Sequence, residues 1–163
     1  MHWRPIVATL LASVALVSCT SKKTITTDQG TTTVETNQLH HTVKMSNRRG
    51  VAIIGRGAVD PKALGLPLYP GAIAARTGAL VTHTTEGTNH IVTLSTDDPF
   101  DRVYDWYRQK MPNGSELAHN EVSGGSTAVF AIGKLGDKDQ KSVEITQVKA
   151  TTTIQLTHTQ ART

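Results

Sequence analysis

The sequence has one cysteine, few aromatic residues and no long hydrophobic run, and each shortage excludes a class of protein. Cys19 is the only cysteine among 163 residues, so no disulfide can form within the chain. Aromatic residues make up 4% of the chain and hydrophobic residues 37%, which predicts a modest, largely aliphatic core. The longest apolar run has about twelve residues, whereas a helix needs about 20 to cross a bilayer. A permanent transmembrane helix is therefore not expected.

Sequence motifs of enzymes and of nucleic-acid-binding proteins are also missing. The chain contains no Gly-x-Ser-x-Gly, no His-Glu-x-x-His and no paired cysteine motif. Residues 50–57 superficially resemble a phosphate-binding loop but lack its Gly-Lys-Ser/Thr ending. The net charge is +4, from 17 basic and 13 acidic residues, without the dense basic stripe of a nucleic-acid binder. We therefore expect no nucleic-acid partner, no cofactor and no enzymatic activity.

The first 18 residues have the form of a secretory signal peptide. Arg4 supplies the positive charge and residues 6–17 supply the apolar run. The run ends in Leu16-Val17-Ser18-Cys19, which resembles the lipobox of bacterial lipoproteins. The resemblance implies cleavage before Cys19, attachment of diacylglycerol to its thiol and further acylation, for example by palmitate. The alternatives are an ordinary signal peptide that ends near a cysteine, or a cytosolic protein with an apolar start.

A further resemblance, to Gram-negative lipoproteins, implies where this anchor would lie. Thr20 follows Cys19 at the position where an aspartate would favour retention in the inner membrane. For a Gram-negative source we therefore expect the outer membrane, and otherwise the cell envelope. Membrane lipid is the partner expected through Cys19, and envelope proteins are further candidate partners.

The segment after the cysteine allows two interpretations. Residues 19–50 are polar and rich in threonine, which favours a flexible tether. Within them, residues 23–36 place β-branched side chains on both sides of Asp28-Gln29-Gly30, a pattern typical of a β-hairpin. Such a hairpin has few apolar side chains, so it would need a larger sheet to join. Arg48, Arg49 and Arg56 lie nearby and could contact lipid phosphates, although solvated charges are the simpler interpretation.

Residues 51–159 are predicted to form one small α+β domain, an antiparallel sheet with one main amphipathic helix packed across one face. Pro61 and Gly65 bound a single helical turn. A hairpin with a two-residue Glu86-Gly87 loop would pair His83 with His90. The expected strands are 51–54, roughly 72–83, 90–96, 116–122, 127–133, 142–148 and 151–157.

The main helix is expected after Asp98, which can act as its N-cap. Five apolar residues then recur with helical spacing, which indicates one buried stripe. They are Phe100, Val103, Tyr104, Tyr107 and Met111. Asp97, Asp98 and Asp101 could instead form a general acid/base pair, but capping of the helix explains them more simply.

Two segments carry a resemblance to a group of uncharacterised bacterial exported proteins. The first is Leu-Gly-Leu-Pro-Leu-Tyr-Pro-Gly-Ala at residues 64–72, and the second is Thr-Asp-Asp-Pro-Phe at 96–100 with the helix after it. The likeness covers residues 60–112. No activity is assigned to that group, so the resemblance implies a domain that begins before residue 60 and brings no functional residues.

Histidines and aromatic residues supply the remaining candidate sites. His83 and His90, with Glu86 or His158 as a third ligand, could bind zinc or copper; the alternative is ordinary solvated histidines at a sheet end. Trp106 and Tyr69 could contact a glycan or a partner, although a packing role is the simpler interpretation.

The sequence thus predicts a non-enzymatic, membrane-anchored lipoprotein with a periplasm-facing binding or assembly domain. One alternative is a metal- or small-ligand-binding lipoprotein that uses His83 and His90. A lipoprotein hydrolase is a third hypothesis.

Overall fold

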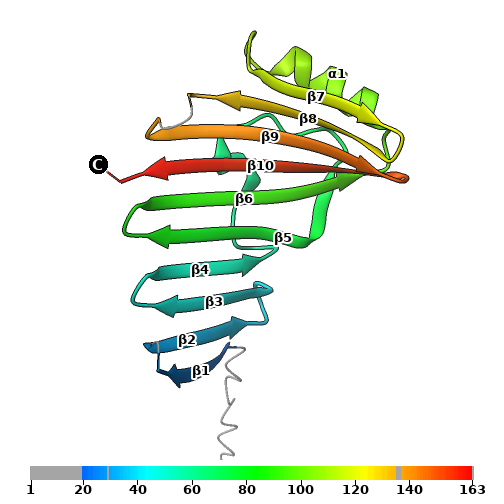
Figure 1. Cartoon of the computed structure of the whole chain (residues 1–163). Coiled ribbons are helices and arrows are strands. Elements are labelled where there is room, and N and C mark those ends of the chain that lie inside the picture. Colours follow the sequence, from blue (N-terminus) through cyan, green and yellow to red (C-terminus); the bar gives the residue numbers. More distant parts are fainter. Residues whose placement is uncertain (1–19, 29, 135–136, 163) are drawn as a thin grey trace, which may run out of the picture.

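The fold is given by a computed structural model that describes residues 20–28, 30–134 and 137–162. These residues form one ten-stranded antiparallel sheet, in the order β1-β2-β3-β4-β5-β6-β10-β9-β8-β7 (Figure 1). The strands are β1 (Thr20–Thr27), β2 (Gly30–Asn37), β3 (Thr42–Asn47), β4 (Gly50–Gly55), β5 (Ile73–Thr84), β6 (Gly87–Thr96), β7 (Glu116–Val122), β8 (Gly125–Ile132), β9 (Asp139–Val148) and β10 (Thr151–Ala161). The expected antiparallel sheet with one packed helix is present, and the chain is mainly β.

Two helical elements accompany the sheet. The short 3₁₀ helix η1 (Pro61–Leu64) begins at proline and is capped by Gly65, whose φ of 62° suits glycine. The α-helix α1 (Phe100–Lys110) follows β6 and carries the chain to the far edge of the sheet, where β7 begins (Figure 1). Strands β7, β8, β9 and β10 then return step by step until β10 lies beside β6. None of the helices in the described part of the chain is long and apolar enough to span a membrane.

The hydrophobic core lies on one face of the sheet, between strands β5–β10 and the helix α1 with the segment before β5. The predicted helix stripe is buried from Phe100 to Met111, with Val103 and Tyr107 fully inaccessible to solvent. Opposite it lie alternate residues of the strands, because successive side chains of a strand point to opposite faces. The strand residues of the core are Ala79, Val81, Val92, Leu94, Ala128, Phe130, Val143, Ile145, Ile154 and Leu156.

The hairpin of β5 and β6 has a different register from the one predicted. His83 pairs with Thr88, and His90 pairs with Val81, so the two-residue loop is Thr85-Glu86. The cross-strand pairing of His83 with His90 was therefore wrong by two residues. A slip of two residues keeps every side chain on its face, so the hydrophobic pattern alone did not distinguish the two registers.

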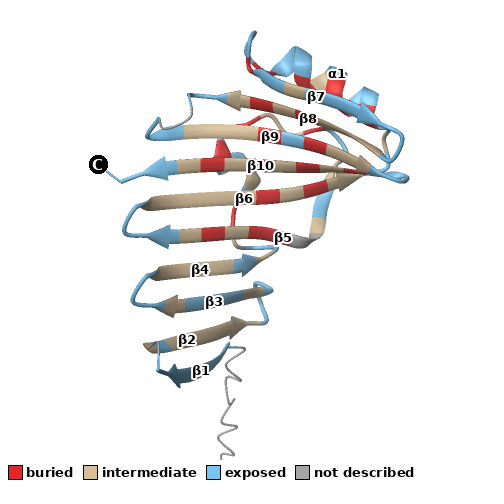
Figure 2. Cartoon of the chain, viewed as in Figure 1, coloured by how far each residue is buried: buried red, intermediate tan, exposed pale blue. Residues whose placement is uncertain are grey.

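The described residues from 20 to 55, which include nearly all of the segment 19–50 that the first interpretation made a flexible tether, form four strands and their turns. Thr27 pairs with Gly30 in a β1–β2 hairpin, and β3 and β4 join this hairpin to β5. The tether interpretation was wrong for these residues because threonine favours β-strands and because β5 offers an edge with which β4 can pair. The sheet therefore extends well beyond the core, as the distribution of buried residues in Figure 2 shows.

Candidate functional site

We call residues 20–57, with strands β1 to β4, the β-extension. None of its described residues is buried, whereas every strand from β5 to β10 except the edge strand β7 contains buried residues. Its strands pair along the sheet, but apart from Ile53, which packs against the core, its side chains have no second layer over them (Figure 2). The β-extension is thus a single-layer sheet that is accessible on both faces, and it is the best candidate for a contact surface.

One face of the β-extension, continuous with the core face, is polar on strands β1 to β3. Lys22, Glu35 and Lys44 lie side by side across three strands, because the register pairs Glu35 with both lysines. The lysine Nζ atoms lie 3.2 and 3.6 Å from the carboxylate oxygens. These two cations lower the pKa of Glu35, with the hydrogen bond from Lys22 as the largest cause. Exposed ion pairs of this kind add little stability, so this ladder mainly keeps the face soluble.

The opposite face, which we call the open face, carries apolar side chains on the β-extension. Val34 pairs with Met45, and Val43 pairs with Ile54, so these side chains project from the same side of the sheet. Ile25 lies diagonally beside Val34. We call these five residues the apolar row. Ile25, Val43, Met45 and Ile54 are between 36% and 44% exposed, and the register brings them together into one apolar patch.

Charge is unevenly distributed between the β-extension and the rest of the chain. Residues 20–57 contain six basic and two acidic side chains, a net charge of +4, whereas residues 58–163 contain ten basic and eleven acidic ones. Four of the six cations, at positions 23, 48, 49 and 56, make no salt bridge with a described carboxylate. The positive charge of the protein is therefore concentrated on the part that has no core.

A shallow hollow of about 240 Å³ lies at the end of the β-extension where β1 ends and β4 begins. Arg48 and Arg49, in the turn between β3 and β4, line it together with threonine hydroxyl groups. The other lining residues are Thr27, Gly30, Thr31, Thr32 and Asn47. Two guanidinium groups beside hydroxyl groups suit an oxyanion, because arginine presents a fork of donors to phosphate.

The histidines predicted as a metal site lie in a row on the core face. The ring of His90 lies 6.3 Å from that of His83 and 6.2 Å from that of His158, nearly perpendicular to both. His158 is held by Asp139, with 2.8 Å between Nε2 and Oδ1, and His83 contacts the Thr88 hydroxyl at 3.0 Å. The rings follow one another across the strands and do not surround a common point. Among residues 20–28, 30–134 and 137–162, no three His, Cys, Asp or Glu side chains are placed to hold a metal.

Burial alters the protonation of the central histidine of this row. Its surroundings lower the pKa of His90, first through desolvation and then through the nearby His158 and His83. The neutral form of His90 is therefore favoured in the folded protein. The row is more readily explained as a pH-sensitive part of the fold than as a ligand set.

Asp98, in the acidic cluster before α1, has a structural role, although not the predicted one. The helix begins after Pro99 and receives no side-chain cap from Asp98. Instead Asp98 accepts hydrogen bonds from the Tyr69 hydroxyl and from Arg102, both at 2.8 Å. The backbone N–H of Phe100 donates to Gln147 of strand β9, so a distant side chain stabilises the start of the helix.

Tyr69 and Trp106, considered above as exposed aromatics, pack together. Tyr69 is 7% exposed and its ring centroid lies 5.4 Å from that of Trp106 in an edge-to-face arrangement. Desolvation and the hydrogen bond to Asp98 raise the pKa of Tyr69. Both residues stabilise the segment before β5 against α1.

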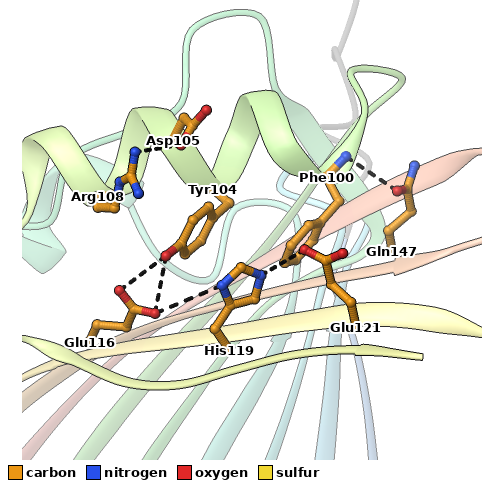
Figure 3. A network of polar contacts seen from close by, with 8 residues as sticks. All are labelled: Phe100, Tyr104, Asp105, Arg108, Glu116, His119, Glu121 and Gln147. Atoms are coloured by element: carbon orange, nitrogen blue, oxygen red, sulfur yellow. Dashed lines mark hydrogen bonds and ion pairs between the residues drawn. The ribbon is translucent and has the colours of Figure 1, made fainter.

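A polar network that the sequence did not indicate joins α1 to the edge strand β7 (Figure 3). The Tyr104 hydroxyl donates to the carboxylate of Glu116 at 3.1 Å, and His119 lies 3.0 Å from Glu121 and 4.0 Å from Glu116. The His119 ring also packs 4.2 Å from the Tyr104 ring. The guanidinium carbon of Arg108 lies over the Tyr104 ring, 5.5 Å from its centroid. This arrangement attaches the helix to an exposed edge, and its residues are too far apart in sequence to form a recognisable motif.

The remaining residues that the sequence analysis singled out take part in none of the contacts described above. Cys19 and the signal peptide at residues 1–18 lie outside the described residues, which begin with β1 at Thr20. Arg56 follows β4, and Glu86 lies exposed in the β5–β6 turn. The apolar row was missed because its members are scattered over residues 25–54 and meet only through the register of four strands.

Comparison with known proteins gives no further assignment. No family model matches the chain, and no curated protein or solved structure shows significant similarity to it.

Proposed function

We propose that the protein is a lipid-anchored, non-enzymatic protein of the cell envelope, in the outer membrane if the source is Gram-negative. Its α+β domain faces the periplasm and acts as a binding or assembly module. The β-extension is the observation that supports this proposal best. Four strands that bury no residue of their own, yet expose an apolar row, are expected where a second surface completes the structure.

The position of the β-extension agrees with an anchor at Cys19. Strand β1 begins at Thr20, so its first Cα atom would lie one peptide step, about 3.8 Å, from the Cα atom of the acylated residue. An anchor there would hold the β-extension at the membrane, and the core with α1 would lie at the other end of the sheet (Figure 1). The proposed module therefore has its lipid and its contact surface on the same side.

The anchor is tested by the variant Cys19→Ala, because lipid attachment requires the thiol. We expect this variant to lose labelling by radioactive palmitate and to accumulate as an unprocessed precursor. Ser18→Ala keeps a small residue before the cysteine and serves as the matched control. Normal mature protein on the membrane in the Cys19→Ala strain would contradict the proposal.

The binding role is tested by photo-crosslinking in intact cells. A photo-reactive amino acid at Ile54 lies in the apolar row, and the same amino acid at Val148, which is 59% exposed, lies at the β9–β10 turn. We expect crosslinked products, with envelope protein or with lipid, to form from position 54 and not from position 148. Equal yields from the two positions would show that the apolar row is not a preferred contact surface.

A further inference from the structure

We propose that the β-extension lies against an anionic phospholipid surface, with its open face toward the membrane and a lipid phosphate in the hollow beside Arg48 and Arg49. This inference rests on the proposed lipid anchor and adds a second contact to it. Its occupant is a lipid bilayer with anionic headgroups, and the argument uses the charge, the exposed side chains and the length of strand β1.

Strand β1 connects two points of attachment. Its first residue, Thr20, follows the acylated cysteine, and its last residue, Thr27, lines the hollow. Seven residue steps of about 3.3 Å separate them, so the two ends lie about 23 Å apart. Lipid at one end and a bound phosphate at the other would lay the strand along the bilayer surface rather than upright on a single anchor.

The hollow has the chemistry of a phosphate site on the side where the membrane would lie. Thr27, Thr32 and Asn47 belong to the same alternating set as Ile25 and Met45, so they project from the open face. Arg48 and Arg49 supply two positive charges beside these hydroxyl and amide groups. A phosphodiester could accept hydrogen bonds from both guanidinium groups while its acyl chains extend toward the apolar row.

The apolar row matches the boundary between headgroups and acyl chains. Its side chains are flanked by threonines and by Lys23 on the same face, so it combines apolar contact with positive charge, as peripheral membrane surfaces do. The apolar row and Lys23 therefore provide the contacts expected of a surface that lies at this boundary.

Charge argues against a second copy of the chain as the occupant. Two open faces packed against each other would bring Lys23, Arg48 and Arg49 of both copies into one interface, which like-charge repulsion disfavours. An anionic surface receives the same charge favourably, and each basic residue near it improves binding about fivefold. The charge distribution therefore favours lipid over self-association.

The test uses the full lipidated chain in vesicles of phosphatidylglycerol or of phosphatidylcholine. Because acylation blocks the only natural cysteine, a cysteine introduced by Val43→Cys carries a single fluorophore on the open face. Val148→Cys is the matched exposed control. We expect nitroxide lipids to quench the label at position 43 in phosphatidylglycerol vesicles, and to leave the label at position 148 unquenched.

Charge variants complete the experiment. The double variant Arg48→Gln, Arg49→Gln loses two basic contacts with the lipid. We expect the ratio of molecules whose β-extension lies on the bilayer to molecules whose β-extension has left it to fall about 30-fold. Lys110→Gln with Lys138→Gln removes the same charge from exposed positions elsewhere and should leave the quenching unchanged. Circular dichroism spectra identical to those of the parent chain establish that the variants fold.

Three results would overturn the proposed membrane contact, and each has a different consequence for the proposed lipid anchor or for the identity of the occupant. A chain that floats with the vesicles but shows equal, weak quenching at both positions retains its anchor and lacks the second contact. A chain that does not float has no lipid anchor, and both proposals then fail. Shielding of position 43 that depends on protein concentration and not on phosphatidylglycerol would identify a second copy as the occupant.

Discussion

The contrast between the core and the β-extension predicts that two isoleucines of the same sheet differ greatly in their contribution to stability. Ile154 in β10 is fully buried, whereas Ile54 in β4 is 38% exposed on the open face. Replacing Ile154 by alanine removes buried methyl groups and leaves a cavity, which costs about 2–5 kcal/mol. The Ile54→Ala change leaves no enclosed cavity, and we expect it to cost less than about 1 kcal/mol.

Urea unfolding followed by circular dichroism measures this difference. With a slope of about 2 kcal/mol per molar urea, a loss of 3 kcal/mol in the free energy of unfolding lowers the midpoint by about 1.5 M. We expect such a shift for Ile154→Ala and a shift below about 0.5 M for Ile54→Ala. Equal, large shifts would show that the open face is covered in the isolated chain and would refute the single-layer β-extension.

Two further predictions concern the core side of the sheet. The buried Tyr107 hydroxyl donates a hydrogen bond to the Pro67 carbonyl at 3.1 Å, and burial raises the pKa of Tyr107. Because Tyr107→Phe removes this hydrogen bond, we expect it to lower the free energy of unfolding by about 1 kcal/mol in urea titrations. An unchanged midpoint would contradict the hydrogen bond. The pKa of His90 is lowered from 6.5 in the folded state, so the unfolded chain binds more protons below pH 6.5 and stability should fall as the pH is lowered through that value. His90→Gln should weaken this pH dependence in thermal unfolding, and an identical dependence in the variant would assign it to other groups.

Local patterns in the sequence predicted the core side of the fold. The recurrence of Phe100, Val103 and Tyr107 at helical spacing predicted the buried stripe, because a helix face is determined by near neighbours in the chain. Pro61 and Gly65 likewise predicted the single turn of η1, since each residue limits its own backbone angles. The strands from β4 onward were expected at nearly their observed positions.

Features that depend on contacts distant in sequence were beyond prediction. The side chain of Asp98 was expected to cap α1, but Tyr69, twenty-nine positions earlier, competes for the carboxylate, and Gln147 takes over the N–H of Phe100. The apolar row depends on the register of β1 to β4, and a threonine-rich strand specifies its partner only weakly. The site proposed here could therefore be recognised only after the strands had been placed side by side.

Intact mass spectrometry of the protein extracted from its membrane tests the central claim most directly. The account predicts a chain that begins at Cys19, lacks residues 1–18 and carries the added mass of diacylglycerol and an acyl chain on that residue. A chain that retains residues 1–18, or one that begins at Cys19 without added lipid, would contradict it.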